Sequence, residues 1–313
     1  MLRGRAFGVG ATAVLFAGLV FLISTRGGTP AGTIRVPSGP QGLAVGDGAV
    51  WVVSADEGRV ARLDPRSHRV TATTHVGGAP LGATFAGGAV WVTEPARDEV
   101  VRVDAMTRVT KKIPVGDAPL DIAADDGSVW VVNDKSNTVS RIDTATAAVA
   151  ATIRVGARPG GIAAGDGAVW VTNAKDHTVS RIDPTTNSVV ATIAVGRTPV
   201  AAATGGGAVW IANGKARTVQ RIDPATNTVV ATIRVGRRPI AVVVGGGAVW
   251  VANVEDHTVS RIDPGDDRVT ATTDVHADPS GLAVSDGTLW VANEGDGVLS
   301  RLPTSTPSAA GRQ

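Results

Sequence analysis

The chain has no cysteine and no tyrosine, and only four phenylalanines among its 313 residues. Without cysteine it cannot carry a disulfide framework, a thiol nucleophile, thiolate metal ligands or a lipidated N-terminal cysteine. Three of the phenylalanines lie within the first 21 residues, so the aromatic side chains of the remaining chain are nearly all tryptophan. Too few rings remain to stack nucleotide bases, and we expect no nucleic-acid partner.

An excess of charge of one sign is also missing, because the formal net charge is only +2. Arg3, Arg5 and Arg26 precede every acidic residue, and without them 27 basic residues face 28 acidic ones. The high isoelectric point of about 9.4 therefore belongs largely to the first residues. This balance gives no support to a general nucleic-acid-binding surface.

The usual catalytic signatures are absent as well. The sequence has no nucleophile elbow, phosphate loop or dinucleotide fingerprint, and the glycine triplets precede strand-like segments instead of helices. Its five histidines show no pairing at zinc-ligand spacing. Beyond the first thirty residues no segment has helical periodicity long enough to predict a helix.

The N-terminal residues form the one long apolar run. Residues 1–5 are basic, residues 6–23 carry no charge, and residues 24–31 are polar and rich in glycine and proline. This order predicts an export signal that is either an uncleaved membrane anchor, forming a hydrophobic helix outside the fold, or a cleaved signal. Arg3 and Arg5 place the N-terminus in the cytoplasm. We therefore expect an extracytoplasmic protein that is tethered to the bacterial cell membrane or secreted.

Seven tryptophans mark a repeat that covers most of the chain. They are Trp51, Trp91, Trp130, Trp170, Trp210, Trp250 and Trp290, at spacings of 40, 39, 40, 40, 40 and 40. A proline stands eleven residues before each tryptophan, a glycine three before, and an arginine eleven after. Such a fixed period predicts one supersecondary unit copied seven times. We divide the chain into a leader (1–31), a repeat domain (32–302) and a flexible tail (303–313).

Each unit is predicted to contain four short strands. In the fourth unit they span roughly residues 161–164, 168–172, 178–183 and 189–195. Gly165, Asp166 and Gly167 predict a tight hairpin turn, and Asp183 followed by Pro184 predicts the next turn. Four antiparallel strands in 40 residues form one propeller blade. The sequence therefore predicts an all-β, seven-bladed β-propeller.

The two ends of the repeat region predict that the ring closes. The seventh unit ends near Leu302 after its third strand, so its fourth strand is missing. Residues 33–36 repeat the wording of residues 152–155, and Ile34 precedes Pro40 by the same six residues that separate Ile153 from Pro159. We expect this N-terminal strand to complete the last blade, which removes the open sheet edges of an unclosed ring.

The motif around the tryptophans resembles two propeller families. Trp170-Val171-Thr172-Asn173 and the RIDPxTNxVVATIxVG stretches are similar to the YVTN repeat, with tryptophan in place of its tyrosine. Known relatives of that kind are mostly extracytoplasmic bacterial proteins. The PxGIAxGxGAxW wording is also similar to the repeats of the virginiamycin B (streptogramin) lyases. That resemblance implies a histidine base and a magnesium-bound glutamate on one face. Glu94 occupies such a glutamate position, whereas Ser54 and Asn133 stand where the histidine would belong.

The loops joining strand four to strand one and strand two to strand three are expected to share one face with the channel mouth. In units four to six these loops carry Arg158, Lys175, Arg197, Lys215, Arg217, Arg237 and Arg238. Elsewhere they carry Asp56, Glu57, Glu94, Asp98, Glu99, Asp117, Asp134, Asp278, Glu294 and Asp296. This asymmetry indicates a cationic sector that attracts an anionic ligand or an oppositely patterned protein. Ordinary solvated loop charge is the alternative.

Asp121 departs from the repeat because it stands two residues after Pro119, where the other units have glycine or alanine. We expect it to face the channel, with Glu94 and Asp117 in the same sector. Three carboxyl groups of this kind could bind Ca²⁺ or Mg²⁺. Unpaired loop acids are the alternative, and no other cofactor is expected.

The sequence leaves several functions open. The leading interpretation is a non-enzymatic binding module, monomeric, that holds an unknown protein or anionic ligand on the loop face and meets the membrane through its N-terminal segment. The alternative is a metal-dependent enzyme, streptogramin lyase-like or lactonase-like, using Glu94, Asp117 and Asp121. A scaffold with no preferred ligand is a third reading.

Overall fold

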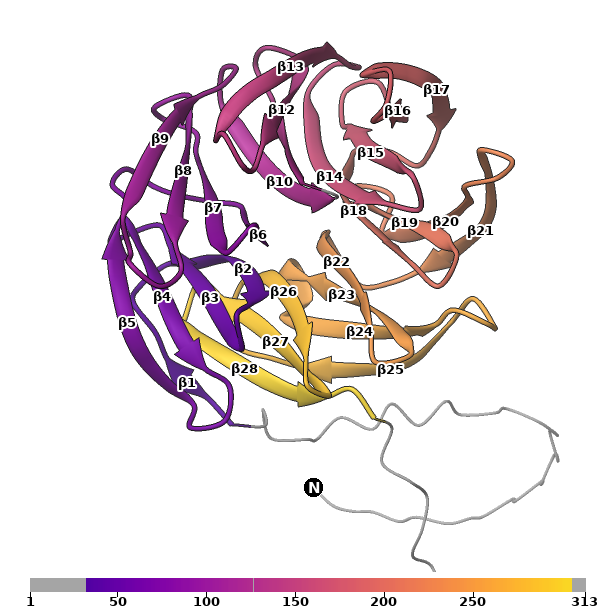
Figure 1. Cartoon of the computed structure of the whole chain (residues 1–313). Coiled ribbons are helices and arrows are strands. Elements are labelled where there is room, and N and C mark those ends of the chain that lie inside the picture. The colour runs from indigo at the N-terminus through magenta and orange to yellow at the C-terminus, as the bar shows by residue number, and fades with distance from the viewer. Residues whose placement is uncertain (1–31, 126, 306–313) are drawn as a thin grey trace, which may run out of the picture.

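The computed structural model describes residues 32–125 and 127–305, which form a closed ring of seven sheets (Figure 1). The predictions for the leader and for most of the tail lie outside these residues. Apart from one 3-10 turn (η1, Val254–Asp256), the secondary structure of the described part is entirely β. No helix in these ranges has the length and hydropathy to cross a membrane.

Each sheet is one blade of four antiparallel strands, numbered here in chain order. Blades 1 to 3 comprise β2 (Pro40–Gly46), β3 (Ala49–Ser54), β4 (Arg59–Asp64), β5 (Arg69–His75); β6 (Ala83–Ala86), β7 (Ala89–Glu94), β8 (Glu99–Asp104), β9 (Thr110–Pro114); and β10 (Pro119–Asp125), β11 (Ser128–Asn133), β12 (Thr138–Asp143), β13 (Ala148–Arg154). Blades 4 and 5 comprise β14 (Pro159–Gly165), β15 (Ala168–Asn173), β16 (Thr178–Asp183), β17 (Ser188–Ala194); and β18 (Pro199–Gly205), β19 (Ala208–Asn213), β20 (Thr218–Asp223), β21 (Thr228–Arg234). Blades 6 and 7 comprise β22 (Pro239–Gly245), β23 (Ala248–Asn253), β24 (Thr258–Asp263), β25 (Arg268–Asp274); and β26 (Pro279–Ser285), β27 (Thr288–Asn293), β28 (Val298–Pro303), β1 (Ile34–Arg35).

Blade 4 shows how the repeat sequence gives this geometry. All six residues of β15 are buried, as its apolar wording predicts, whereas β17 alternates between exposed and half-buried positions over most of its length. Asp166 and Gly167 have φ values of 54° and 72° between β14 and β15. Two consecutive positive φ values define the type I′ turn, whose twist matches that of the flanking strands. The predicted turn is therefore where the chain reverses.

The ring closes as the sequence predicted. β1 pairs antiparallel with β28, and Ile34 lies opposite Leu299. The strand order of blade 7 is β1-β28-β27-β26, so the N-terminal strand supplies the outermost strand of the last blade. Figure 1 shows the first and last parts of the propeller side by side. The ladder continues slightly beyond β28, because Thr304 N–H donates to the Gly287 carbonyl at 2.9 Å.

The core consists of seven apolar clusters. Each contains one tryptophan of the ladder and the residues that pack against it, as when Trp170 meets Ile211 and Ile222 of the next blade. Trp170 has no exposed surface. Burying an indole of about 200 Å² stabilises the fold by roughly 5 kcal/mol in transfer terms. The ladder is therefore the main reason why neighbouring blades stay packed.

The repeated arginines of blades 3, 4 and 5 join their blade to the next one. The guanidinium of Arg141 lies 5.0 Å from the ring centroid of Trp130 in its own blade. Its Nη1 donates to the Pro184 carbonyl of blade 4 at 2.7 Å and to Asn187 Oδ1 at 3.0 Å. Asp143 instead accepts the N–H groups of Ala145 and Thr146 in its own turn. The arginine and the aspartate of this repeat thus have separate structural roles.

Candidate functional site at the loop face

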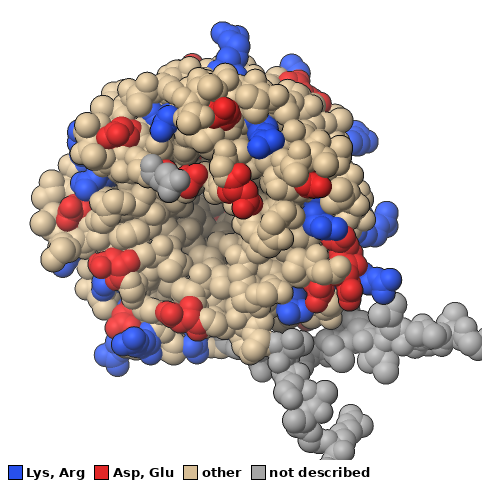
Figure 2. Space-filling view, turned by 45° about the vertical axis from the view of Figure 1, so that its right-hand side comes forward, with Lys and Arg blue, Asp and Glu red and all other residues tan. Residues whose placement is uncertain are grey.

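The two predicted loop families do share one face, called the loop face here. In blade 4, the 174–177 loop lies against the 155–158 loop, with Ala174 N–H donating to the Arg158 carbonyl at 2.9 Å. Blade 5 repeats this contact between Gly214 N–H and the Thr198 carbonyl at 2.8 Å. Figure 2 shows the opposite face of the ring, with charged side chains of both signs around a central hollow.

The seven cations of the predicted sector are all exposed on this face, but they are not equivalent. They are Arg158, Lys175, Arg197, Lys215, Arg217, Arg237 and Arg238. Arg158 Nε lies 2.9 Å from Asp134, and Arg237 forms an ion pair with Asp256. The other five form no ion pair within residues 32–125 and 127–305. Five cations from blades 4 to 6 therefore remain available to a ligand.

The same sector contains acids that the sequence analysis left out, namely Asp176, Glu255 and Asp256. Asp176 accepts the Ala157 N–H at 2.7 Å, and Asp256 accepts the Arg237 N–H at 2.6 Å. The Arg237 N–H and guanidinium hold the pKa of Asp256 below its ordinary value. The sector is thus less positive than predicted. An acid six residues after Trp170, Trp250 and Trp290 was the available signal.

Some of the acids on the remaining blades are held by loop backbone. Asp98 Oδ1 accepts the Ala118 N–H at 2.8 Å, and Glu57 Oε1 accepts the Ser38 N–H at 2.9 Å. These bonds satisfy N–H groups that the turns leave free. Unlike the five unpaired cations, these carboxylates already form hydrogen bonds that stabilise the loops.

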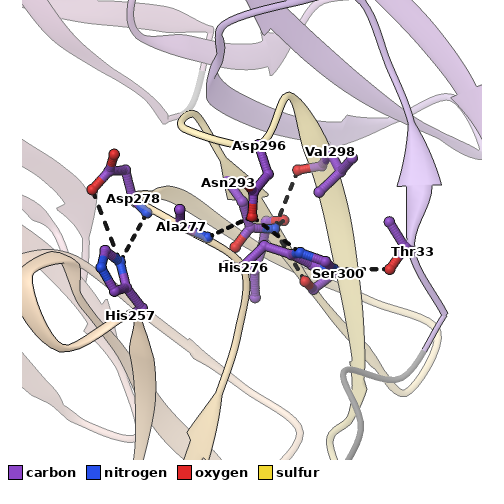
Figure 3. A network of polar contacts seen from close by, with 10 residues as sticks. Thr33, His257, His276, Ala277, Asp278, Asn293, Asp296, Val298 and Ser300 are labelled. Carbon is purple, nitrogen blue, oxygen red and sulfur yellow. Dashed lines mark hydrogen bonds and ion pairs between the residues drawn. The ribbon is translucent and has the colours of Figure 1, made fainter.

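Figure 3 shows how histidines join the same system near blade 7. His276 Nδ1 lies 3.1 Å from Asp296 Oδ2, and its Nε2 lies 2.9 Å from Thr33 Oγ1. Asp296 also accepts the Ala277 N–H at 2.9 Å, which is the main reason why its pKa is lowered. His257 Nδ1 accepts the Asp278 N–H at 3.2 Å. Both rings therefore serve the loops between blades 6 and 7.

The asparagine at the end of strand two supports strand three. Asn173 is fully buried, and its Nδ2 donates to Thr178 Oγ1 at 3.0 Å and Ser180 Oγ at 2.9 Å. The side chain points back along the blade, because the two hydroxyls of β16 face it across the hairpin.

Glu94 replaces that asparagine in blade 2 and lacks its partners. Its side chain is fully buried, and neither carboxyl oxygen forms a well-aligned hydrogen bond among the described residues, although the Ala79 N–H lies close enough to oppose the rise in its pKa. Val101 stands where the regular blade has a serine. A Cβ at Gly78 would lie 2.0 Å from Glu94 Oε2, so only glycine leaves room for the carboxyl. Burial raises the pKa of Glu94 to about 7, although Arg97 acts in the opposite direction.

Asp121 faces the central channel, as predicted. The channel cavity, of about 310 Å³, is lined by the inner strands of all seven blades, and Asp121 is the one charged group among the described residues lining it. Asp121 Oδ1 accepts the N–H of Ile122 at 2.9 Å, and its Oδ2 accepts the N–H of Ile162 in blade 4 at 3.0 Å. Burial raises the pKa of Asp121 to about 6. The carboxyl thus links β10 to β14.

The three predicted metal ligands occupy different settings. Glu94 is buried below the loop face, Asp117 is exposed in the loop before β10, and Asp121 lines the channel. In the part of the chain that the structure describes, no group of three or more histidine, aspartate or glutamate side chains could hold a metal ion. The structure therefore does not bring Glu94, Asp117 and Asp121 together as a ligand set.

Fold and site together define a seven-bladed β-propeller with a polar loop face over a narrow channel. Residues 32–302 match the model of the virginiamycin B lyase family, and the chain belongs to this family. No curated protein matches the chain.

Three solved structures show the same architecture. A streptogramin B lyase is 18% identical with a TM-score of 0.77, covering 86% of this chain and 96% of its own. A catalytically inactive virginiamycin B lyase from Staphylococcus aureus with quinupristin is 20% identical with a TM-score of 0.78, covering 87% and 98%. Hydrazine synthase from Kuenenia stuttgartiensis is 17% identical with a TM-score of 0.75, covering 93% and 100%. At sequence identities this low, the similarity to these structures is a similarity of fold alone.

The magnesium site implied by the lyase resemblance can be compared with the residues present. Glu94 has two oxygens without a well-aligned hydrogen bond, which suit a ligand. At the matching positions of the neighbouring blades, Ser54 Oγ donates to the Pro37 carbonyl, and Asn133 Nδ2 donates to the hydroxyls of β12. Neither side chain supplies a base or a second carboxylate. These residues therefore do not fit a lyase-type magnesium site.

Proposed function

We propose that this propeller is a non-enzymatic, extracytoplasmic binding module whose loop face holds an anionic ligand or an acidic protein surface. The observation that carries the proposal is the set of five exposed, unpaired cations on blades 4 to 6. Acids of the same face such as Asp98, Asp176 and Asp256 accept loop N–H groups, whereas these cations have no partner to give up on binding. Desolvating these cations when a ligand binds therefore costs less free energy than desolvating the acids that must first give up a hydrogen bond.

The five cations are spread over the loop face, and this arrangement suits an extended anionic surface better than a small molecule held in a deep pocket. Lys175, Arg197, Lys215 and Arg217 come from two adjacent blades, and Arg238 comes from the next. A spread of like charges on a rigid ring raises the rate of encounter with an anion and makes binding sensitive to salt. An N-terminal anchor would hold this ring at the outer surface of the membrane.

Charge reversal tests this function directly. The variant Arg197→Glu/Lys215→Glu/Arg238→Glu should lose retention on an immobilised acidic peptide such as polyglutamate, in the full chain at low salt. The control Arg154→Glu/Arg234→Glu/Arg268→Glu makes the same change in net charge on exposed outer strands. Equal retention of both variants, or equal loss, would remove the loop face from consideration.

An enzymatic function of the streptogramin lyase or lactonase kind is the second candidate, because of the family membership and Glu94. A carboxyl with a pKa near 7 can exchange protons at neutral pH. However, Glu94 is fully buried, so a substrate would reach it only after the loop around Gly78 moved. For this reason the binding function is better supported.

Incubating the full chain with quinupristin, with and without Mg²⁺ or Ca²⁺, tests the enzyme. Linearised product that disappears in Glu94→Gln would establish it. Mg²⁺ or Ca²⁺ can also be titrated while the melting temperature is followed, because an ion that binds only the native state must raise the melting temperature. No product and no shift at millimolar metal would exclude the metal-dependent reaction.

A further inference from the structure

The seam between blades 7 and 1 differs from the other junctions of the ring. A cavity of about 530 Å³ opens there between β1, the turn before β5 and β28. It is lined by Gly32, Thr33, Ile34, Arg35, His68, Arg69, Val70 and Arg301. The outermost strand of blade 7, β1, has only two residues, whereas the corresponding strand of every other blade has five to seven.

The lining of this seam pocket is basic. Arg35, Arg69 and Arg301 line it together with His68, and no acidic residue belongs to the lining. None of these three arginines forms an ion pair within the described ranges 32–125 and 127–305. Three guanidinium groups with no carboxylate among them repel one another unless an anion lies between them.

The partner of Arg301 makes the anomaly specific. At the junctions that follow blades 3, 4 and 5 the equivalent arginine finds an oxygen on the next blade, as when Arg221 Nη2 lies 2.7 Å from Asp267 Oδ2. Arg301 Nη1 instead donates to Nε2 of His68, the residue that replaces this oxygen-bearing side chain in blade 1. Because a guanidinium can only donate, the imidazole must accept. Arg301 Nε is buried and has no acceptor among the described residues, a feature that it shares with Arg181, Arg221 and Arg261.

Arg301 also loses the contact that its counterparts make with tryptophan. Six of the seven arginines stack over the tryptophan of their own blade, at 5.0 Å to 6.0 Å from its centroid. At Trp290 the His68 ring lies 6.5 Å from the indole, tilted by 58°. Arg301 therefore does not stack over Trp290, and its guanidinium lines the seam pocket.

We propose that the seam pocket binds a phosphate group through Arg35, Arg69 and Arg301. The planar guanidinium fork matches two oxygens of a phosphate, and three arginines match its charge and its several acceptor oxygens. The pocket is distinct from the loop face, since its residues lie on the outer strands β1 and β5 and on β28. It thus adds a second anion site to the proposed loop-face function.

The position of the pocket suggests two sources of phosphate. Gly32, the first described residue, is part of its lining. Residues 24–31 span at most about 28 Å when extended. If residues 6–23 are an anchor, this pocket lies within that reach of the bilayer surface, where lipid headgroups carry phosphodiesters. A free phosphate compound in solution has the same recognition chemistry.

Calorimetric titration of the full chain in neutral detergent micelles tests the proposal. The probes are inorganic phosphate, dioctanoyl phosphatidylglycerol, and zwitterionic dioctanoyl phosphatidylcholine, all at constant ionic strength. Arg35→Gln/Arg69→Gln should weaken binding of the preferred probe at least tenfold. The control Arg234→Gln/Arg268→Gln changes the equivalent exposed positions of blades 5 and 6 and should leave it within twofold.

The arms separate the sources of phosphate. Tighter binding of phosphatidylglycerol than of inorganic phosphate assigns the site to a lipid headgroup, and the reverse assigns it to a soluble compound. No binding of either at millimolar concentration, or equal weakening by both double variants, overturns the phosphate site. If the first double variant melts early, Arg69→Gln against Arg268→Gln decides, because both side chains are exposed at the start of a strand.

Discussion

Blades 4 and 2 have the same four-stranded frame, yet they treat the end of strand two differently. In blade 4, Asn173 is buried with its amide bonded to two hydroxyls of β16. In blade 2, Glu94 is equally buried, but its carboxyl oxygens have no well-aligned hydrogen-bond partner among the described residues. In the regular blade the N–H groups of the Asn173 amide are satisfied and only its Oδ1 lacks a partner, whereas in the exceptional blade both oxygens of an ionisable carboxyl lack one. Exceptions to the repeat are therefore the places to look for function.

The largest expected effect is on closure of the ring, which both blades require. Deleting residues 33–36 removes β1, its ladder with β28 and the buried side chain of Ile34. We expect a loss of at least about 4 kcal/mol in the free energy of unfolding, because apolar burial and strand hydrogen bonds are lost together. Urea denaturation followed by tryptophan fluorescence measures it. Arg35→Ala, at an exposed position of the same strand, is the control, and a deletion variant as stable as the control would contradict closure by β1.

The second-largest effect is expected at Trp170, on which the packing of blade 4 depends. Trp170→Ala should destabilise the protein by about 4 kcal/mol, since it leaves a cavity against Ile211 and Ile222. Val190→Ala, on the exposed side of β17, should change stability by no more than about 0.5 kcal/mol. Chemical denaturation of both variants checks this pair. A small effect of the tryptophan change would show that blades are not held together by the ladder.

Glu94 provides the sharpest test of the difference between the blades. Its folded-state pKa, about 7, exceeds the ordinary value of 4.5, so the native state holds a proton more tightly than the unfolded state. Stability from this group is therefore complete below pH 4.5 and is lost as the pH rises to about 7. Glu94→Gln removes the buried charge and should stabilise the protein by about 2 kcal/mol at pH 8, but not at pH 4. Melting temperatures of both proteins at both pH values measure this. The same gain at both pH values would mean that ionisation is not the cause.

The smallest effects are expected at the turn aspartates of blades 1 to 5. Backbone N–H groups of the turns, with the Thr185 hydroxyl foremost at Asp183, lower the pKa of Asp64, Asp104, Asp143, Asp183 and Asp223. Their stabilisation is present above the unfolded pKa of 3.8 and is lost as the pH falls through the lower folded values. Stability should therefore be greatest between about pH 4 and pH 6, with Glu94 limiting the alkaline side. A melting temperature that keeps rising below pH 3 would contradict this assignment.

The candidate sites were only partly predictable. The cationic loop residues could be placed on one face because the period assigns every residue to a strand or a loop. The capping acids Asp176 and Asp256 were missed, because a bond between residues 19 apart forms only when two loops fold against each other. The link from Asp121 to Ile162 was equally invisible, since it joins strands of different blades. The seam pocket needed coordinates, because it results from the short β1 lying beside His68 and Arg69.

The sequence alone determined the number of blades, the strand order within them and the strand that closes the ring, because each follows from the period and from local hydrophobic and turn patterns. Tertiary structure decided which polar groups find partners. Arg141 is satisfied by the next blade and Arg301 meets a histidine, although the two arginines have the same place in the repeat. Hydrogen bonding depends on atoms brought within about 3 Å of one another, and residues far apart in the chain reach that distance only in the folded ring.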